Sequence, residues 1–136
     1  MPFDFLEIFD NDRKIPLNQY SALTLAYIGD CVYELYVRLY VIKDKDYPVK
    51  VLHKTSTSYV KASAQAAYFH KIEGILTEEE MSVFKRGRNT NSHPPKNADL
   101  IDYKIATGVE TLIGYTYLKG DRARLMELLG HIKDIT

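Results

Sequence analysis

The sequence predicts an all-α protein with a single domain over residues 1–136, and three observations support this prediction. Apolar residues recur at helical spacing in two long stretches, around residues 23–42 and 105–118. No run of six residues shows the apolar–polar alternation that is typical of a half-buried strand. The chain has 136 residues, of which 46% are hydrophobic and 26% charged, as expected for one globular domain.

The first predicted helix begins at Ser21, or nearer Pro16 or Asn18, and extends to about residue 42. One of its faces is an apolar stripe with alternating spacings of three and four residues, formed by Leu25, Ile28, Val32, Leu35 and Leu39. A second stripe beside it contains two acids, so Asp30 and Glu34 share a face of this helix.

Pro48 opens a second helical region, and the hydroxyl-rich residues 55–58 predict a bend before a third helix at 59–69. Thr77 and Glu80 form a capping-box pattern that predicts a helix ending near Arg86. Residues 87–97 contain one glycine, three asparagines and a pair of prolines, which indicate an irregular connection.

A long helix is predicted from Asp99 to about Lys119, with Gly120 as its stop, and Asp121 then caps a last helix over 122–129. No stretch of about 20 apolar residues is present, so we expect no membrane span. The first residues lack a secretory pattern, and the single cysteine, Cys31, is interpreted as a small buried apolar residue. These features predict a cytoplasmic location.

Two acids stand inside the apolar helical stretches, Asp30 and Glu110. A buried carboxylate is costly unless a cation or hydrogen-bond donors compensate it. Each acid has a glycine beside it or four residues away, Gly29 and Gly114, where helix interiors normally avoid glycine. One such acid could simply bond a neighbouring backbone group, but two favour a facing pair that holds Mg²⁺.

A basic cluster is the second candidate site, because the net charge of zero means that any nucleic-acid binding must rest on a local patch. The cluster lies just before the helix of Glu110 and consists of Lys85, Arg86, Arg88 and Lys96, with Asn89 among them. Such side chains can contact the phosphates and 2′-hydroxyls of double-stranded RNA. The alternative is an ordinary solvated loop.

Both acidic motifs resemble those of the ribonuclease III family. Residues 25–32, Leu-Ala-Tyr-Ile-Gly-Asp-Cys-Val, are similar to the family's Leu-Glu-Phe-Leu-Gly-Asp-Ala-Val, and residues 110–114, Glu-Thr-Leu-Ile-Gly, to its Glu-Ala-Leu-Ile-Gly. Ala26 and Thr107 stand where the family usually has further acids, and we expect no double-stranded-RNA-binding domain after residue 136. These departures, with residues 85–89 and 95–97, resemble Mini-III, the short branch of the family.

The resemblance implies an all-helical, homodimeric, Mg²⁺-dependent endonuclease that cuts double-stranded RNA and matures the ends of large-subunit (23S) ribosomal RNA precursors. It implies that Asp30 and Glu110 are the metal ligands and the catalytic pair, with the number of metal ions open. Glu34 would act on the metal through water, or pair with Arg38 one turn away, and Thr107 would lie beside Glu110. The alternative is a non-catalytic helical module for RNA binding or dimerisation, which Ala26 and Thr107 favour.

Overall fold

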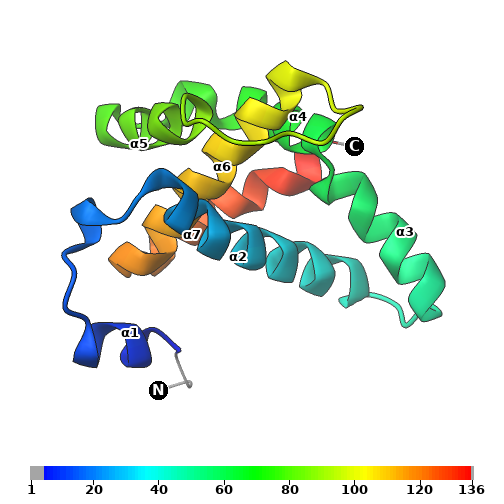
Figure 1. Ribbon diagram of the computed structural model, residues 1–136. Helices are drawn as coiled ribbons and strands as arrows, with labels where there is room; N and C mark the ends of the chain where they lie inside the picture. The colour runs from blue at the N-terminus through cyan, green and yellow to red at the C-terminus, as the bar shows by residue number, and fades with distance from the viewer. Residues whose placement is uncertain (1–4, 136) are drawn as a thin grey trace.

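The computed structural model describes residues 5–135, and this part of the chain contains helices and no strand, which confirms the all-α prediction (Figure 1). The α-helices are α1 (Leu6–Asp12), α2 (Ala22–Ile42), α3 (Val49–Val60), α4 (Ala62–Ile72), α5 (Glu78–Arg88), α6 (Leu100–Lys119) and α7 (Arg122–Leu129). Short 3₁₀ turns occupy Leu17–Gln19, Glu73–Ile75 and Gly130–Ile135. Over the described residues, no helix is both long and apolar enough to cross a membrane.

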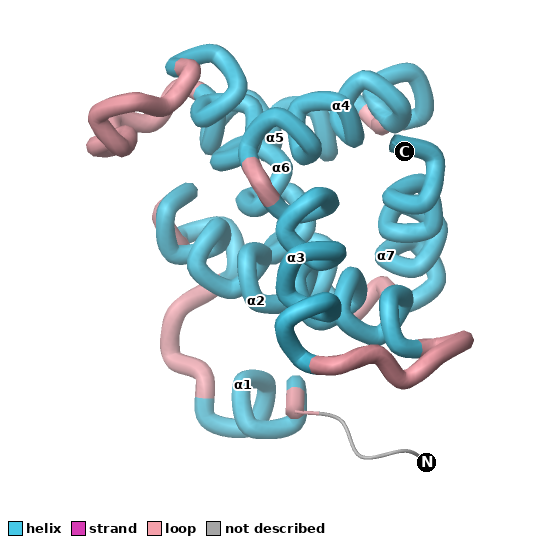
Figure 2. Tube along the Cα trace, turned by 90° about the vertical axis from the view of Figure 1, so that its right-hand side faces the viewer, coloured by secondary structure: helices cyan, strands magenta, loops and turns pink. Residues whose placement is uncertain are grey.

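Helix α6 is the centre of the bundle, because α2, α4, α5 and α7 all pack against it, and its packing against α2 is the most extensive. The core between these helices is filled by large apolar side chains, which include Tyr33, Tyr68, Phe69, Phe84, Leu112, Ile113 and Leu128. Helix α1 stands apart from the bundle and buries none of its residues (Figure 2). The domain therefore holds together around α6.

Most predicted helix ends are confirmed, and side-chain caps account for them. The Ser21 Oγ accepts a hydrogen bond from the Thr24 amide at the start of α2, and Thr77 with Glu80 forms a complete capping box at the start of α5. Asp99 and Asp121 cap α6 and α7. Gly120 ends α6 with φ at 82°, a left-handed conformation that suits glycine.

Two predicted boundaries differ from those in the structure. No bend occurs at residues 55–58, because the Thr57 and Ser58 hydroxyls donate to carbonyls of their own helix, those of His53 and Thr55, and α3 continues to Val60. The chain breaks at Lys61, where ψ is 157°. Helix α5 ends at Arg88, two residues beyond the predicted end near Arg86, so part of the expected basic loop is helical.

The stripe expected on α2 is only partly buried. Leu35 and Leu39 are 56% and 55% exposed, and Cys31 is exposed as well, contrary to its expected burial. The face that packs against α6 contains small residues among larger ones, namely Leu25, Ala26, Gly29, Tyr33 and Val37. Helix α2 turns this face inward because small side chains let α6 approach closely.

Candidate active site

The site begins at a glycine crossing between α2 and α6. A methyl group added at Gly29 would lie 1.7 Å from the carbonyl oxygen of Glu110, and one added at Gly114 would lie 1.9 Å from that of Leu25. No side chain larger than a hydrogen atom fits at either position, so two glycines allow the backbones to touch. This contact places Asp30, next to Gly29, beside Glu110.

The Asp30 and Glu110 carboxyl groups lie within hydrogen-bonding range of one another. Asp30 is exposed, contrary to the expectation that both acids are buried, whereas Glu110 is partly buried. Burial, and then the negative charge of Asp30, raises the pKa of Glu110 to about 8. In the metal-free protein near neutral pH, the protonated form of Glu110 is therefore favoured.

A third polar side chain, that of Gln65 on α4, contacts this pair. Its Nε2 donates to Glu110 Oε2 over 3.2 Å and to the Val60 carbonyl oxygen over 2.8 Å. The Tyr33 hydroxyl donates to the neighbouring carbonyl of Tyr59 over 2.9 Å, and burial raises the pKa of Tyr33. Two hydrogen bonds thus fix the corner between α3 and α4 next to the carboxyl pair.

The donor set suits a hard divalent cation. Two carboxylates from different helices offer oxygen ligands, and a cation would relieve the repulsion between their charges. Over residues 5–135, no group of three or more His, Cys, Asp and Glu side chains is arranged to hold a metal ion. Mg²⁺ needs no such group, since it is commonly bound by one or two carboxylates and keeps several water ligands. Asp30 and Glu110 are the residues that could hold it.

The positions that depart from the ribonuclease III motifs are buried. Ala26 lies in the interface of α2 with α6, and both Ala26 and Thr107 are 7% exposed. The Thr107 hydroxyl donates a hydrogen bond to the Tyr103 carbonyl of its own helix over 3.0 Å. Glu34 is partly buried and forms an ion pair with Arg38, the alternative that its spacing suggested. Asp30 and Glu110 therefore remain the acids that interact at this site.

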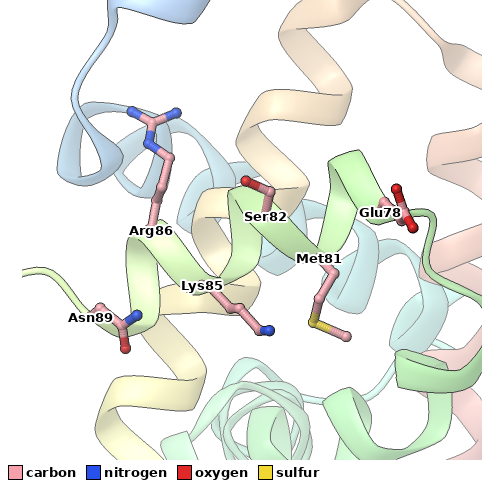
Figure 3. A pocket seen from close by; sticks show the side chains of 6 residues that line it. All are labelled: Glu78, Met81, Ser82, Lys85, Arg86 and Asn89. Carbon is pink, nitrogen blue, oxygen red and sulfur yellow. The ribbon is translucent and has the colours of Figure 1, made fainter.

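The predicted RNA-binding residues lie on the last turns of α5 and after it. The side chains of Lys85 and Asn89 border an open hollow over α5, which is lined by Glu78, Met81, Ser82, Lys85, Arg86 and Asn89 (Figure 3). Arg86 points away from Lys85 and donates to the Tyr20 carbonyl over 3.0 Å. Arg88 donates to the Asn89 side chain, and Lys96 is exposed in the connection to α6.

This basic end of α5 packs against the turn of α6 that carries Glu110. A methyl group added at Gly87 would lie 2.2 Å from the Thr111 hydroxyl and 3.0 Å from the Cα of Gly108. Gly108 and Thr111 belong to the turn of α6 that carries Glu110. The structure therefore brings Lys85, Arg88 and the catalytic candidates to the same part of α6.

Gln65 is the site residue that the sequence did not identify. Its signal is faint, because the only unusual feature is a long amide side chain among the small residues 62–67 of α4. The hydrogen bond with Glu110 joins residues 45 positions apart, and local periodicity says nothing about such a pair.

An all-helical domain with two motif acids side by side defines a ribonuclease III-type domain, and comparison of the sequence with known families agrees. Residues 23–121 match the ribonuclease III domain. The chain belongs to the ribonuclease III family, in its Mini-ribonuclease 3 branch, and it is an endoribonuclease of this type. This membership sets aside the alternative of a non-catalytic module.

Three relatives illustrate the match. A Mini-ribonuclease 3 of Clostridium tetani is 51% identical over 118 residues, which cover 85% of this chain and 78% of that protein. One from a Thermoanaerobacter species is 44% identical over 126 residues, covering 92% and 89%. A crystal structure of a Fusobacterium nucleatum protein superposes with a TM-score of 0.78 at 30% identity, covering 87% of this chain and 95% of that one.

Proposed function

We propose that this endoribonuclease cuts double-stranded RNA as a homodimer that depends on Mg²⁺, with Asp30 and Glu110 as metal ligands and catalytic residues. The contact between these two carboxyl groups, from helices that cross at a pair of glycines, is the observation that carries the proposal. The resemblance to Mini-III adds the ends of 23S ribosomal RNA precursors as the substrate and the cytoplasm as the location.

The chemistry follows from the charges at the site. When bound, Mg²⁺ would stabilise the negative charge that builds on the phosphate oxygens and would lower the pKa of a water molecule. Glu110 must lose its proton to bind a cation, and the hydrogen bond from Gln65 keeps its carboxylate in place. Asp30 is exposed, so substrate can reach the pair from its side.

Binding of the duplex is assigned to the basic end of α5. Lys85 is exposed there and Arg88 partly so, and Lys96 is exposed on the connection that follows. Gly87, between Lys85 and Arg88, packs against the turn of α6 that carries Glu110, so these charges are proposed to hold phosphates near the cleaved bond. Asn89 offers an amide that can bond a 2′-hydroxyl, which is the group that distinguishes RNA from DNA. Arg86 is partly engaged with Tyr20 and contributes less.

The dimer is proposed to form along α2. Large apolar side chains on its outer face are 44–78% exposed and are spaced by four, eight, four and three residues: Leu23, Tyr27, Leu35, Leu39 and Ile42. A stripe of this length on a soluble domain indicates a protein interface. Asp30 lies next to the stripe, so a second copy would sit beside the carboxyl pair.

Cleavage of a labelled RNA duplex tests the proposal. We expect cuts with Mg²⁺ and none after a chelator is added in excess. Asp30→Asn and Glu110→Gln should each abolish cleavage and leave folding and duplex binding intact, because the amides keep the shape and remove the charge. Cleavage by either variant at the rate of the unaltered protein would disprove the assigned pair.

A further inference from the structure

One buried hydrogen-bond acceptor beside the carboxyl pair has no partner among the described residues, the Oε1 of Gln65. Gln65 is only 3% exposed. Both hydrogens of its amide are used, one on the Val60 carbonyl and one on Glu110. Because the Val60 carbonyl can only accept, the amide must present its nitrogen to it, and the orientation of the oxygen is fixed as well.

An acceptor in this position needs a donor. Proteins give nearly every buried polar atom a hydrogen-bond partner, since an unpaired one costs folding free energy. The oxygen of Gln65 belongs to the same amide group whose nitrogen bonds Glu110, so it lies near the carboxylate. Water molecules bound to a divalent cation are polarised and donate strongly, and Mg²⁺ keeps several of them.

We propose that Gln65 is a positioning residue of the cation site. Its Nε2 holds the Glu110 carboxylate in the orientation that binds the cation, and its Oε1 accepts a hydrogen bond from a water on that cation. The inference rests on the proposed function, because it assumes that Asp30 and Glu110 bind a divalent ion. It adds a residue on a third helix, α4, which lies outside both sequence motifs.

The rigidity of its surroundings supports this role. Gln65 lies in the first turn of α4, where its backbone N–H donates a hydrogen bond to the Lys61 carbonyl over 3.0 Å. The preceding corner is tied to α2 by the bond from the Tyr33 hydroxyl to Tyr59. A side chain held at both its base and its tip loses little conformational freedom when the ion arrives, which is what a positioning residue requires.

Calorimetric binding of Mn²⁺ to the RNA-free protein tests the inference without reference to activity. Gln65→Leu, and Gln65→Met as a second variant of similar length, should weaken Mn²⁺ binding about 10-fold or more, as loss of an outer partner of a metal site does. Thr116→Val is the matched control. Thr116 is 3% exposed, as Gln65 is, and its hydroxyl donates a hydrogen bond to the Leu112 carbonyl. Loss of this hydroxyl should lower the melting temperature and leave the Mn²⁺ affinity unchanged.

Cleavage kinetics provide the second readout. The Gln65 variants should reduce kcat and raise the Mg²⁺ concentration for half-maximal cleavage, while duplex affinity measured in chelator stays the same. Unchanged Mn²⁺ affinity in a folded Gln65 variant would overturn the inference and leave the function standing, provided Asp30→Asn abolishes Mn²⁺ binding. If Asp30→Asn binds Mn²⁺ as tightly as the unaltered protein, the assigned cation site fails, and the role of Gln65 fails with it.

Discussion

Replacing Gly29 with alanine should separate the two helices that carry the catalytic acids. The added methyl group would lie 1.7 Å from the Glu110 carbonyl oxygen, whereas real contacts of this kind are essentially never shorter than 3.0 Å. The gap must open by about 1.3 Å, the difference between these distances. The methyl group would also lie 2.7 Å from the Gly114 nitrogen, so it meets backbone on every side that it faces. A flexible side chain could move aside, but backbone cannot.

The expected cost follows from this movement. Overpacking a core typically costs about 1–3 kcal/mol, and a clash with the backbone of the central helix should reach the upper end, about 3 kcal/mol. In a domain of this size that corresponds to a fall in melting temperature of about 10 °C. Cleavage should fall about 100-fold in the protein that remains folded, because a misplacement of about 1 Å is enough for such a loss.

The assay combines thermal unfolding, followed by circular dichroism, with duplex cleavage at a temperature where Gly29→Ala is folded. Gly74→Ala is the matched control, since a methyl group there would meet nothing within 4 Å. It should change neither quantity. A Gly29→Ala protein with the stability and cleavage rate of the unaltered one would refute the argument that the glycine crossing sets the position of the carboxyl pair.

Three further predictions concern charge and assembly. The raised pKa of Glu110, about 8, should make the metal-free protein lose stability as the pH rises from 5 to 8, by an amount on the order of a few kcal/mol, and Glu110→Gln should lack this loss. Below the pKa of the unfolded chain the carboxyl is protonated in both states, so the full stability is present there, and melting curves over this range measure it. Lys85→Ala with Arg88→Ala should weaken duplex binding and reduce its salt slope by roughly 0.7–0.9 for each phosphate that the protein no longer neutralises. Leu35→Arg should yield a monomer by light scattering, whereas Met126→Arg, at a residue 53% exposed on α7, should not.

Each of these has a clear contrary outcome. Parallel pH profiles for the unaltered protein and Glu110→Gln would show that the carboxyl is ionised throughout. The control Lys133→Ala, in the last 3₁₀ turn, should leave the salt slope of duplex binding unchanged. If the slope is equally unchanged after the Lys85 and Arg88 substitutions, this part of α5 is merely solvated. A Leu35→Arg protein that remains a dimer would move the interface away from the outer face of α2.

Much of the fold was predictable because its determinants are local. Caps at Ser21, Thr77, Asp99 and Asp121 and the stop at Gly120 each act within a few residues, so the sequence locates the helix ends that they set. The hydroxyl-rich residues 55–58 misled because serine and threonine can bond either a turn or their own helix, and the structure has the second arrangement.

The site was predictable in part. Asp30 and Glu110 could be identified as acids in apolar helices with unusual glycines near them, and the structure shows that these glycines lie where α2 and α6 cross. The exposure of Asp30 and Cys31 could not be read from their apolar neighbours, because α2 has two apolar faces and only one packs against α6. Gln65 could not be found, since its role depends on α4 lying next to α6.

The most direct test of the central claim is to locate a cation in a crystal. Crystals of the metal-free protein, soaked in Mn²⁺, give an anomalous signal at each bound ion. We expect a peak between the carboxyl groups of Asp30 and Glu110, and its absence from crystals of Glu110→Gln soaked in the same way. A peak elsewhere with none at this pair, or no peak at all at a Mn²⁺ concentration that supports cleavage, would contradict the assignment of these two acids as the metal ligands.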